Sequence, residues 1–215
     1  MSSLDVLLKS MCPLGVSRKP LSEFVEIVRG NGLQKKDFTP DGVGCIHYGQ
    51  IYTKFNVATK TVLSHVSEEL ASSLKIVNPG DTIMAITSEN VEDICKCVVW
   101  EGNDLIVTGG HSAILRHSQN SRYLAYWFQT QDFRDQKKKI VHGTKVMEVS
   151  PKDLSNVLVP LPPLKVQDEI VCILDSFTEL TARKKQYEYY RDRLLSFDNI
   201  SDEEREARIE VGFFG

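Results

Sequence analysis

Apolar residues recur at alternating intervals of four and three along residues 164–197, the most regular pattern in the chain. This stretch contains no glycine, and its flanking prolines at positions 160, 162 and 163 lie where a helix start tolerates proline. The spacing predicts one unbroken helix, roughly 50 Å long at ~1.5 Å rise per residue. Most positions at this spacing are apolar or aromatic, which is typical of a coiled-coil seam. The seam positions are Val166, Ile170, Ile173, Phe177, Leu180, Lys184, Tyr187, Arg191 and Leu194.

A helix of this length has two interpretations. It pairs with another long helix through its seam, or it is an amphipathic helix packed on its own globular domain. The length and the regular seam favour pairing, because an exposed apolar stripe marks an interface. We expect an antiparallel, two-fold symmetric homodimer, since homodimer interfaces are usually self-complementary. The expected dimerisation residues are Val166, Ile170, Ile173, Phe177, Leu180, Tyr187 and Leu194.

The pattern changes to short apolar runs separated by turn signals between residues 43 and 117. Residues 3–10 read as a short helix that Ser3 could cap, and residues 21–32 fit either a short helix or a strand. Residues 121–138 read as a helix, followed by a loop and an extended stretch over 142–162. Strands are predicted over residues 45–52, 60–65, 82–87, 94–100, 105–107 and 112–116.

These elements predict an α+β fold, in which a β-rich globular domain is followed by a long coiled-coil helix. The expected domains are residues 1–159, the long helix over 160–197, and an acidic tail over 198–215. The tail carries two basic and six acidic residues, which accounts for the net charge of -3. The rest of the chain is close to neutral, so binding to nucleic acid would need a local basic face.

Several observations exclude other classes of protein. The five scattered cysteines indicate reduced thiols in the cytoplasm, and no apolar run is long enough to span a bilayer. There is no G-x-x-x-x-G-K-[ST] loop, no H-E-x-x-H set and no Asn-Pro-Pro-aromatic tetrapeptide. Cys95 and Cys97 are separated by one residue, which is not a common zinc pairing. We therefore expect no catalytic residues, no metal and no cofactor.

Residues 162–197 closely resemble the conserved helical region of specificity subunits of type I restriction-modification systems. An N-terminal Cys12-Pro13-x-Gly15-Val16 turn and the pair Arg29-Gly30 extend the resemblance over most of the chain. A complete specificity subunit has two reading domains and two such helices, so this chain looks like a single-domain half-subunit. The helical marks are Pro162-Pro163-Leu164, Gln167, Ile170-Val171, Leu174-Asp175, Phe177 and Gln186-Tyr187-Glu188-Tyr189-Tyr190-Arg191.

The resemblance implies a non-catalytic, sequence-specific DNA recognition subunit that reads one half-site of a bipartite target. In the family the helix separates two reading domains and docks methyltransferase subunits. The implied partners are double-stranded DNA, modification subunits, restriction or translocase subunits through the complex, and a second copy of the chain, with no membrane. The alternative is a coiled-coil interaction module that modifies or blocks a full-length specificity subunit without reading DNA.

Candidate DNA contacts lie in polar loops, where each residue has ordinary solvated surface as its alternative interpretation. The three lysines at 137–139 end a predicted helix, where they either compensate the helix dipole or contact phosphate. The candidates are Lys35, Lys36, Tyr52, Thr53, Lys54, His111, Ser112, Lys137, Lys138, Lys139, His142 and Lys145.

Overall fold

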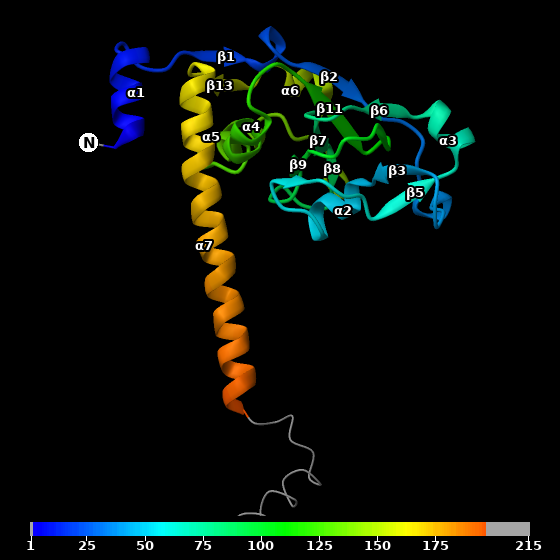
Figure 1. Cartoon of the computed structure of the whole chain (residues 1–215). Helices are drawn as coiled ribbons and strands as arrows, with labels where there is room; N and C mark the ends of the chain where they lie inside the picture. Colours follow the sequence, from blue (N-terminus) through cyan, green and yellow to red (C-terminus); the bar gives the residue numbers. More distant parts are fainter. Residues whose placement is uncertain (1, 197–215) are drawn as a thin grey trace, which may run out of the picture. The chain divides into compact units, whose positions relative to one another are not determined.

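A computed structural model of the chain describes residues 2–196, and the predicted acidic tail lies outside the described residues (Figure 1). The chain divides into two compact units, with the boundary between Val171 and Cys172. The boundary falls inside the long helix α7 (Leu164–Ser196). The first unit is a mixed α+β globular domain, as the sequence predicts.

Strands of the globular unit form a five-stranded sheet, a four-stranded sheet and two short ladders. The five-stranded order is β2 (Glu26–Arg29), β11 (Ser112–Arg116), β7 (Thr82–Ala85), β9 (Cys97–Trp100) and β4 (Ala58–Thr59). The four-stranded order is β5 (Ser64–Val66), β3 (Val43–Ile46), β10 (Ile106–Thr108) and β6 (Lys75–Val77). The ladders pair β1 (Arg18–Pro20) with β13 (Leu158–Pro160), and β8 (Thr87–Ser88) with β12 (Met147–Glu148).

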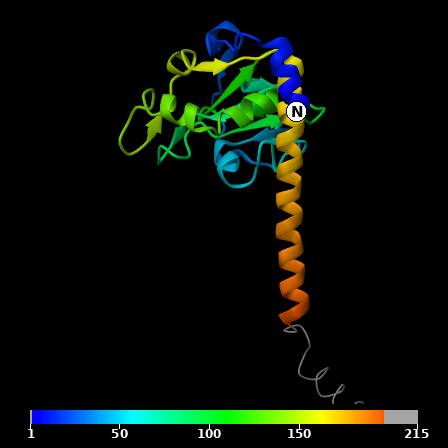
Figure 2. The same ribbon diagram turned by 90° about the vertical axis from the view of Figure 1, so that its left-hand side faces the viewer.

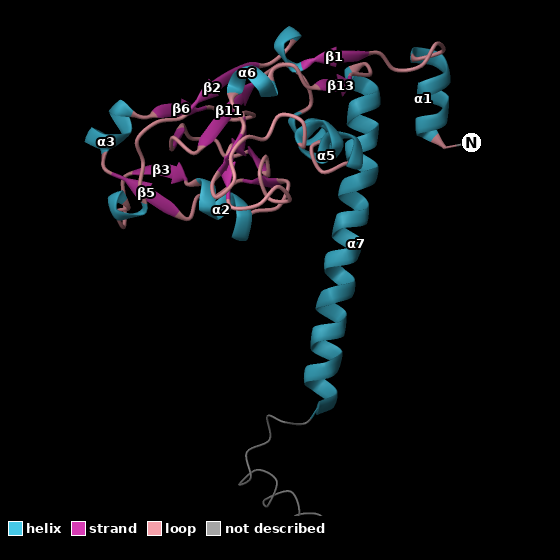
Figure 3. Ribbon diagram, turned by 180° about the vertical axis from the view of Figure 1, so that it is seen from behind, coloured by secondary structure: helices cyan, strands magenta, loops and turns pink. Residues whose placement is uncertain are grey.

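The helices are mostly short, and Figure 3 shows them among the strands. Side chains of the residues before α4, α5 and α6 accept hydrogen bonds from the first helical turns, as good N-caps do. The helices are α1 (Ser3–Met11), α2 (Tyr48–Thr53), α3 (Glu68–Ser73), α4 (Ser121–Trp127), α5 (Gln131–Lys137), α6 (Pro151–Leu154) and α7, with 3-10 turns η1 (Leu21–Glu23) and η2 (Lys35–Asp37).

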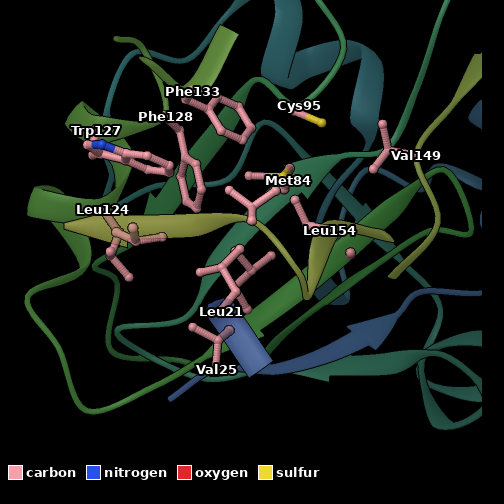
Figure 4. Packing of buried hydrophobic residues seen from close by; sticks show 14 of the residues in the cluster. Leu21, Val25, Met84, Cys95, Leu124, Trp127, Phe128, Phe133, Val149 and Leu154 are labelled. Atoms are coloured by element: carbon pink, nitrogen blue, oxygen red, sulfur yellow. The ribbon is translucent and has the colours of Figure 1, made fainter. Parts of the chain in front are cut away.

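The central strands of the five-stranded sheet are buried on both faces. In β7, Met84 joins one hydrophobic cluster and Ile83 joins another, because neighbouring side chains of a strand point to opposite faces. The first cluster is covered by α4 and α5, where the rings of Trp127, Phe128 and Phe133 pack together with centroids 4.9 to 5.5 Å apart (Figure 4). The loops that leave the sheet therefore start from a fixed framework.

The first turns of α7 belong to the globular core. Strand β13 is joined to the helix by residues 161–163 (Figure 2), and Val166 and Gln167 have no exposed surface. Val171 lies in the first hydrophobic cluster and Ile170 packs against it. Val166 is thus a core residue, which corrects its assignment to the dimerisation seam. The reason is that the chain's own domain already covers this part of the apolar stripe.

The second unit contains the remainder of α7. The predicted helix is confirmed over Leu164–Ser196, and residue 197 lies outside the described residues. Phe177, Leu180 and Tyr187 are 61%, 59% and 66% exposed, and Ile173 is partly buried. The Leu194 side chain lies outside the described residues. None of the described helices has the length and apolar character needed to cross a membrane.

Local hydrogen bonds correct several predicted elements. The predicted strand over 45–52 ends at Ile46, because His47 caps α2. The predicted helix over 121–138 is two helices, since Thr130 caps a second one after a turn. Ser2, not Ser3, caps α1. Residues 21–32 form a 3-10 turn followed by β2, and the predicted strand over 112–116 is confirmed.

Candidate functional site

Aromatic and imidazole rings from two distant segments meet at the start of α2. His47 and Tyr48 have ring centroids 4.4 Å apart, and Tyr48 and His111 have centroids 4.8 Å apart. Tyr52, one turn along α2, meets the Tyr48 ring edge-on at 6.1 Å. We call these four residues, His47, Tyr48, Tyr52 and His111, the His–Tyr cluster. His111 lies in the loop just before β11, so the cluster joins a helix to a sheet loop.

Thr87 of β8 holds two members of the cluster. The Tyr52 hydroxyl donates to the Thr87 carbonyl oxygen, and Thr87 Oγ1 shares a 2.9 Å hydrogen bond with His111 Nδ1. Burial raises the pKa of Tyr52 above its ordinary value, so its hydroxyl stays protonated as a donor. Tyr52 and Thr87 therefore form a framework that fixes the orientation of the His111 ring.

His47 is the buried, neutral member of the cluster. Its Nδ1 accepts a 3.1 Å hydrogen bond from the Gly49 amide, while the Gln50 side chain accepts from the His47 amide. This reciprocal pair is a capping box, which starts the helix. Burial first, and then the charges of Lys35 and His111, lower the pKa of His47 to about 4. With Nδ1 accepting, the single ring proton of neutral His47 lies on Nε2.

The Tyr48 hydroxyl and His111 Nε2 are two polar atoms of the cluster that a ligand could contact. Neither atom makes a hydrogen bond to any residue between 2 and 196. Tyr48 is partly exposed and His111 is exposed, so solvent reaches this side of the cluster. The two oriented rings thus offer two polar atoms that can hydrogen-bond to a ligand.

A basic residue lies beside the cluster. A Cβ added to Gly49 would lie 3.9 Å from Lys35 Cε, which places that lysine beside the start of α2. Strand β12 pairs with β8, which carries Thr87, and His142 bridges to Glu148 through the backbone. Lys145 lies in the turn between His142 and β12, and this turn requires Gly143 because of its φ of +100°. Lys35, His142 and Lys145 are all exposed.

The structure corrects two of the predicted contacts. Lys137 is buried, and its ammonium donates to the carbonyl oxygens of Ile94 at 2.8 Å and Glu92 at 3.1 Å. It stabilises the turn around Cys95, whose φ of 65° is unusual for a residue other than glycine. Ser112 has no exposed surface because it begins the buried strand β11. Neither side chain is placed to contact a ligand.

The remaining predicted DNA contacts make no hydrogen bond, ion pair or ring contact with the His–Tyr cluster among residues 2–196. Lys138 is paired with Asp135 at 3.4 Å, and the Thr53 hydroxyl donates to the Gly49 carbonyl. The sequence reasoning missed His47, Tyr48 and Thr87. A Gln three residues after His47 is the capping-box spacing that could have revealed the helix start. The exposed predicted contacts away from the cluster are Lys36, Thr53, Lys54, Lys138 and Lys139.

No three potential metal-ligating side chains come together in residues 2–196. A groove of about 490 Å³ lies between the end of α1 and the start of α7, lined mainly by residues such as Met11, Val16 and Leu164. Its lining includes no carboxylate and no imidazole, so this groove offers no general acid–base pair.

Comparison with known proteins gives consistent matches. Residues 13–188 match the family model for the type I restriction modification DNA specificity domain. The chain is 30% identical over 132 residues to a type I restriction enzyme specificity subunit of Haemophilus influenzae, covering 54% of this chain and 31% of that protein. It is 40% identical over 90 residues to the EcoR124I/EcoR124II specificity subunit of Escherichia coli, covering 35% and 21%.

A solved structure shares the fold. The HsdS subunit from Thermoanaerobacter tengcongensis matches with a TM-score of 0.58 at 21% identity, over 85% of this chain and 44% of that one. At this identity the likeness concerns the fold alone. The chain spans less than half the length of each of these proteins.

Replacing His47 by Asn should keep the cap and remove one titrating group. Because the pKa of His47 is about 4 in the folded chain and 6.5 ordinarily, the unfolded chain binds a proton first as pH falls. Between pH 7 and pH 5 the wild type should therefore lose roughly 1–2 kcal/mol more unfolding free energy than His47→Asn. Urea unfolding at both pH values measures this. His117, whose pKa is also lowered by burial, is common to both proteins. An equal loss of unfolding free energy in the two proteins would contradict the lowered pKa of His47.

Proposed function

The chain belongs to the family of type I restriction modification DNA specificity domains, and from this membership we propose that it is the sequence-recognition component of a restriction-modification complex. It reads one half-site of a bipartite DNA target through its globular unit and docks methyltransferase subunits. It has no catalytic role of its own, and the restriction or translocase subunits join it through the complex. Target DNA is double-stranded.

The His–Tyr cluster with Lys35 beside it is the observation that supports DNA reading best. Sequence readout needs oriented polar groups at base edges, while lysines on phosphates set the register. The cluster offers rings held by packing and by a hydrogen bond, and the exposed Lys35 lies beside it. The chain as a whole is slightly acidic, so DNA binding depends on such a local arrangement of basic and polar groups.

A second function is favoured by the exposed stripe on α7. Phe177, Leu180 and Tyr187 would suit an interaction module that enters a full-length specificity subunit without reading DNA. The two functions differ in one measurable property. A DNA-reading chain shifts DNA in a salt-dependent manner when modification subunits are present, whereas the interaction module does not.

The purified chain should neither methylate nor cut DNA, whether supplied with S-adenosylmethionine or with ATP and magnesium. Adding its modification subunits should produce sequence-specific binding and methylation, while those subunits alone should show neither. Gel shifts and methyl-transfer assays on plasmid DNA provide the measurement. Methyl transfer by the chain alone, surviving further purification, would refute the proposal. A complex that forms without shifting DNA would favour the interaction module.

Dimerisation through α7 is the next part of the proposal. Replacing Phe177 and Leu180 by Asp places two charges in the exposed stripe and should convert a dimer into monomers. Replacing Cys172 and Thr178 by Asp adds the same charge at exposed positions outside the seam and should leave the dimer intact. Sedimentation at tens of micromolar measures the mass. A wild-type chain that remains monomeric would remove this part of the proposal.

A two-fold dimer should recognise an interrupted palindrome, because identical reading domains meet identical sequences on opposite strands. We propose that α7 sets the spacer. Inserting four residues within 178–182 lengthens the helix by about 6 Å, so the spacer should grow by one or two base pairs at ~3.4 Å each. As a control, the same four residues that were inserted can instead replace residues 178–181. This keeps the length of the helix and should leave the spacer unchanged. Methylome sequencing reports both outcomes, and a changed half-site with an unchanged spacer would contradict the proposal.

A further inference from the structure

We propose that Tyr48 and His111 form the pair that reads base edges within the half-site. The inference rests on the proposed function and specifies which side chains carry out the reading. The pair combines two segments more than sixty residues apart in the chain, and the contact between the rings is direct, with centroids 4.8 Å apart.

Each ring is oriented by residues that the ligand does not need to touch. His111 is held through Nδ1 by Thr87 Oγ1 at 2.9 Å, and its Nε2 has no hydrogen bond to residues 2–196. Tyr48 packs against the neutral ring of His47 at 4.4 Å, and its hydroxyl has no hydrogen bond to any part of the chain that the structure describes. The packing of the Tyr48 ring and the hydrogen bond of the His111 ring thus fix both rings before a ligand binds, which reduces the entropy lost on binding.

The chemistry of the two atoms suits base edges. A tyrosine hydroxyl both donates and accepts, and an imidazole nitrogen does one or the other according to its tautomer. The major groove presents purine N7 and O6 acceptors and amino donors in patterns that differ between base pairs. Because the two rings are in direct contact, with centroids 4.8 Å apart, we expect both to reach one base pair or two adjacent base pairs, which are ~3.4 Å apart.

The surrounding framework has the rigidity that such reading requires. Tyr52 is tied to β8 through the Thr87 carbonyl, and β8 is tied in turn to β12 through its backbone. The side chains of Lys36 and Lys54 are exposed and make no ion pair or hydrogen bond among residues 2–196. We therefore assign base reading to Tyr48 and His111, and sequence-independent phosphate contact to the lysines.

Two conservative variants test this division. Tyr48→Phe removes one hydroxyl and retains the ring packing, and His111→Asn retains a polar group near Thr87 while removing Nε2. Each is assembled with the modification subunits and bound to a DNA library randomised at both half-sites. Selected sequences should lose about five- to tenfold discrimination at one position or two adjacent positions, with the salt dependence unchanged.

Lys36→Gln and Lys54→Gln are the matched controls. They should weaken binding to all sequences alike and lower the slope of log affinity against log salt by about one for each contact removed. A wild-type complex that selects a sequence, combined with unchanged preferences in both Tyr48→Phe and His111→Asn, would overturn this inference alone. If the two variants lost base preference at widely separated positions of the half-site, the pairing of Tyr48 with His111 would be overturned. A wild-type complex that selects no sequence would instead overturn the proposed function.

Discussion

The buried amide of Gln167 ties the long helix to the globular unit. Its Nε2 donates to the Gln119 side chain at 2.9 Å and to the Pro162 carbonyl at 2.8 Å, and its Oε1 accepts from the Asn120 amide at 3.1 Å. Leaving such a buried group unpaired costs about 1–3 kcal/mol, so these bonds specify one register for the start of α7. The segment that they fix, residues 117–120, connects β11 to α4, and both elements contribute to the main core.

The same helix therefore has two different apolar surfaces. Val166 and Val171 stabilise the chain's own domain, whereas Phe177, Leu180 and Tyr187 remain exposed roughly two to four turns after Val171. Because α7 is continuous from Leu164 to Ser196, any partner bound at the exposed residues is connected to the core through helical backbone. This continuity is the physical basis for proposing that a helix sets the spacing of a DNA target.

Sequence patterns predicted the parts of the structure that depend on neighbouring residues. The long helix was placed within one residue of its last described position, since neither glycine nor an internal proline interrupts its spacing. The ends of the short strands are harder to predict from sequence. The strand predicted over 45–52 ends at Ile46 because the capping box of His47 starts a helix there. Lys137 was assigned to the surface, yet its ammonium bonds the carbonyl of Ile94, 43 residues away in the chain. The pairing of Tyr48 with His111 likewise joins distant segments and leaves no local pattern.

The central claim is that the globular unit reads the half-site while the helix sets the spacer. A chimera tests it most directly, with residues 1–171 taken from a family member of different specificity and residues 172–215 from this chain. Sites methylated in cells that carry the chimera and its modification subunits would be determined by sequencing. We expect the half-site to follow residues 1–171 and the spacer to follow the helix. A half-site that follows residues 172–215 would contradict it.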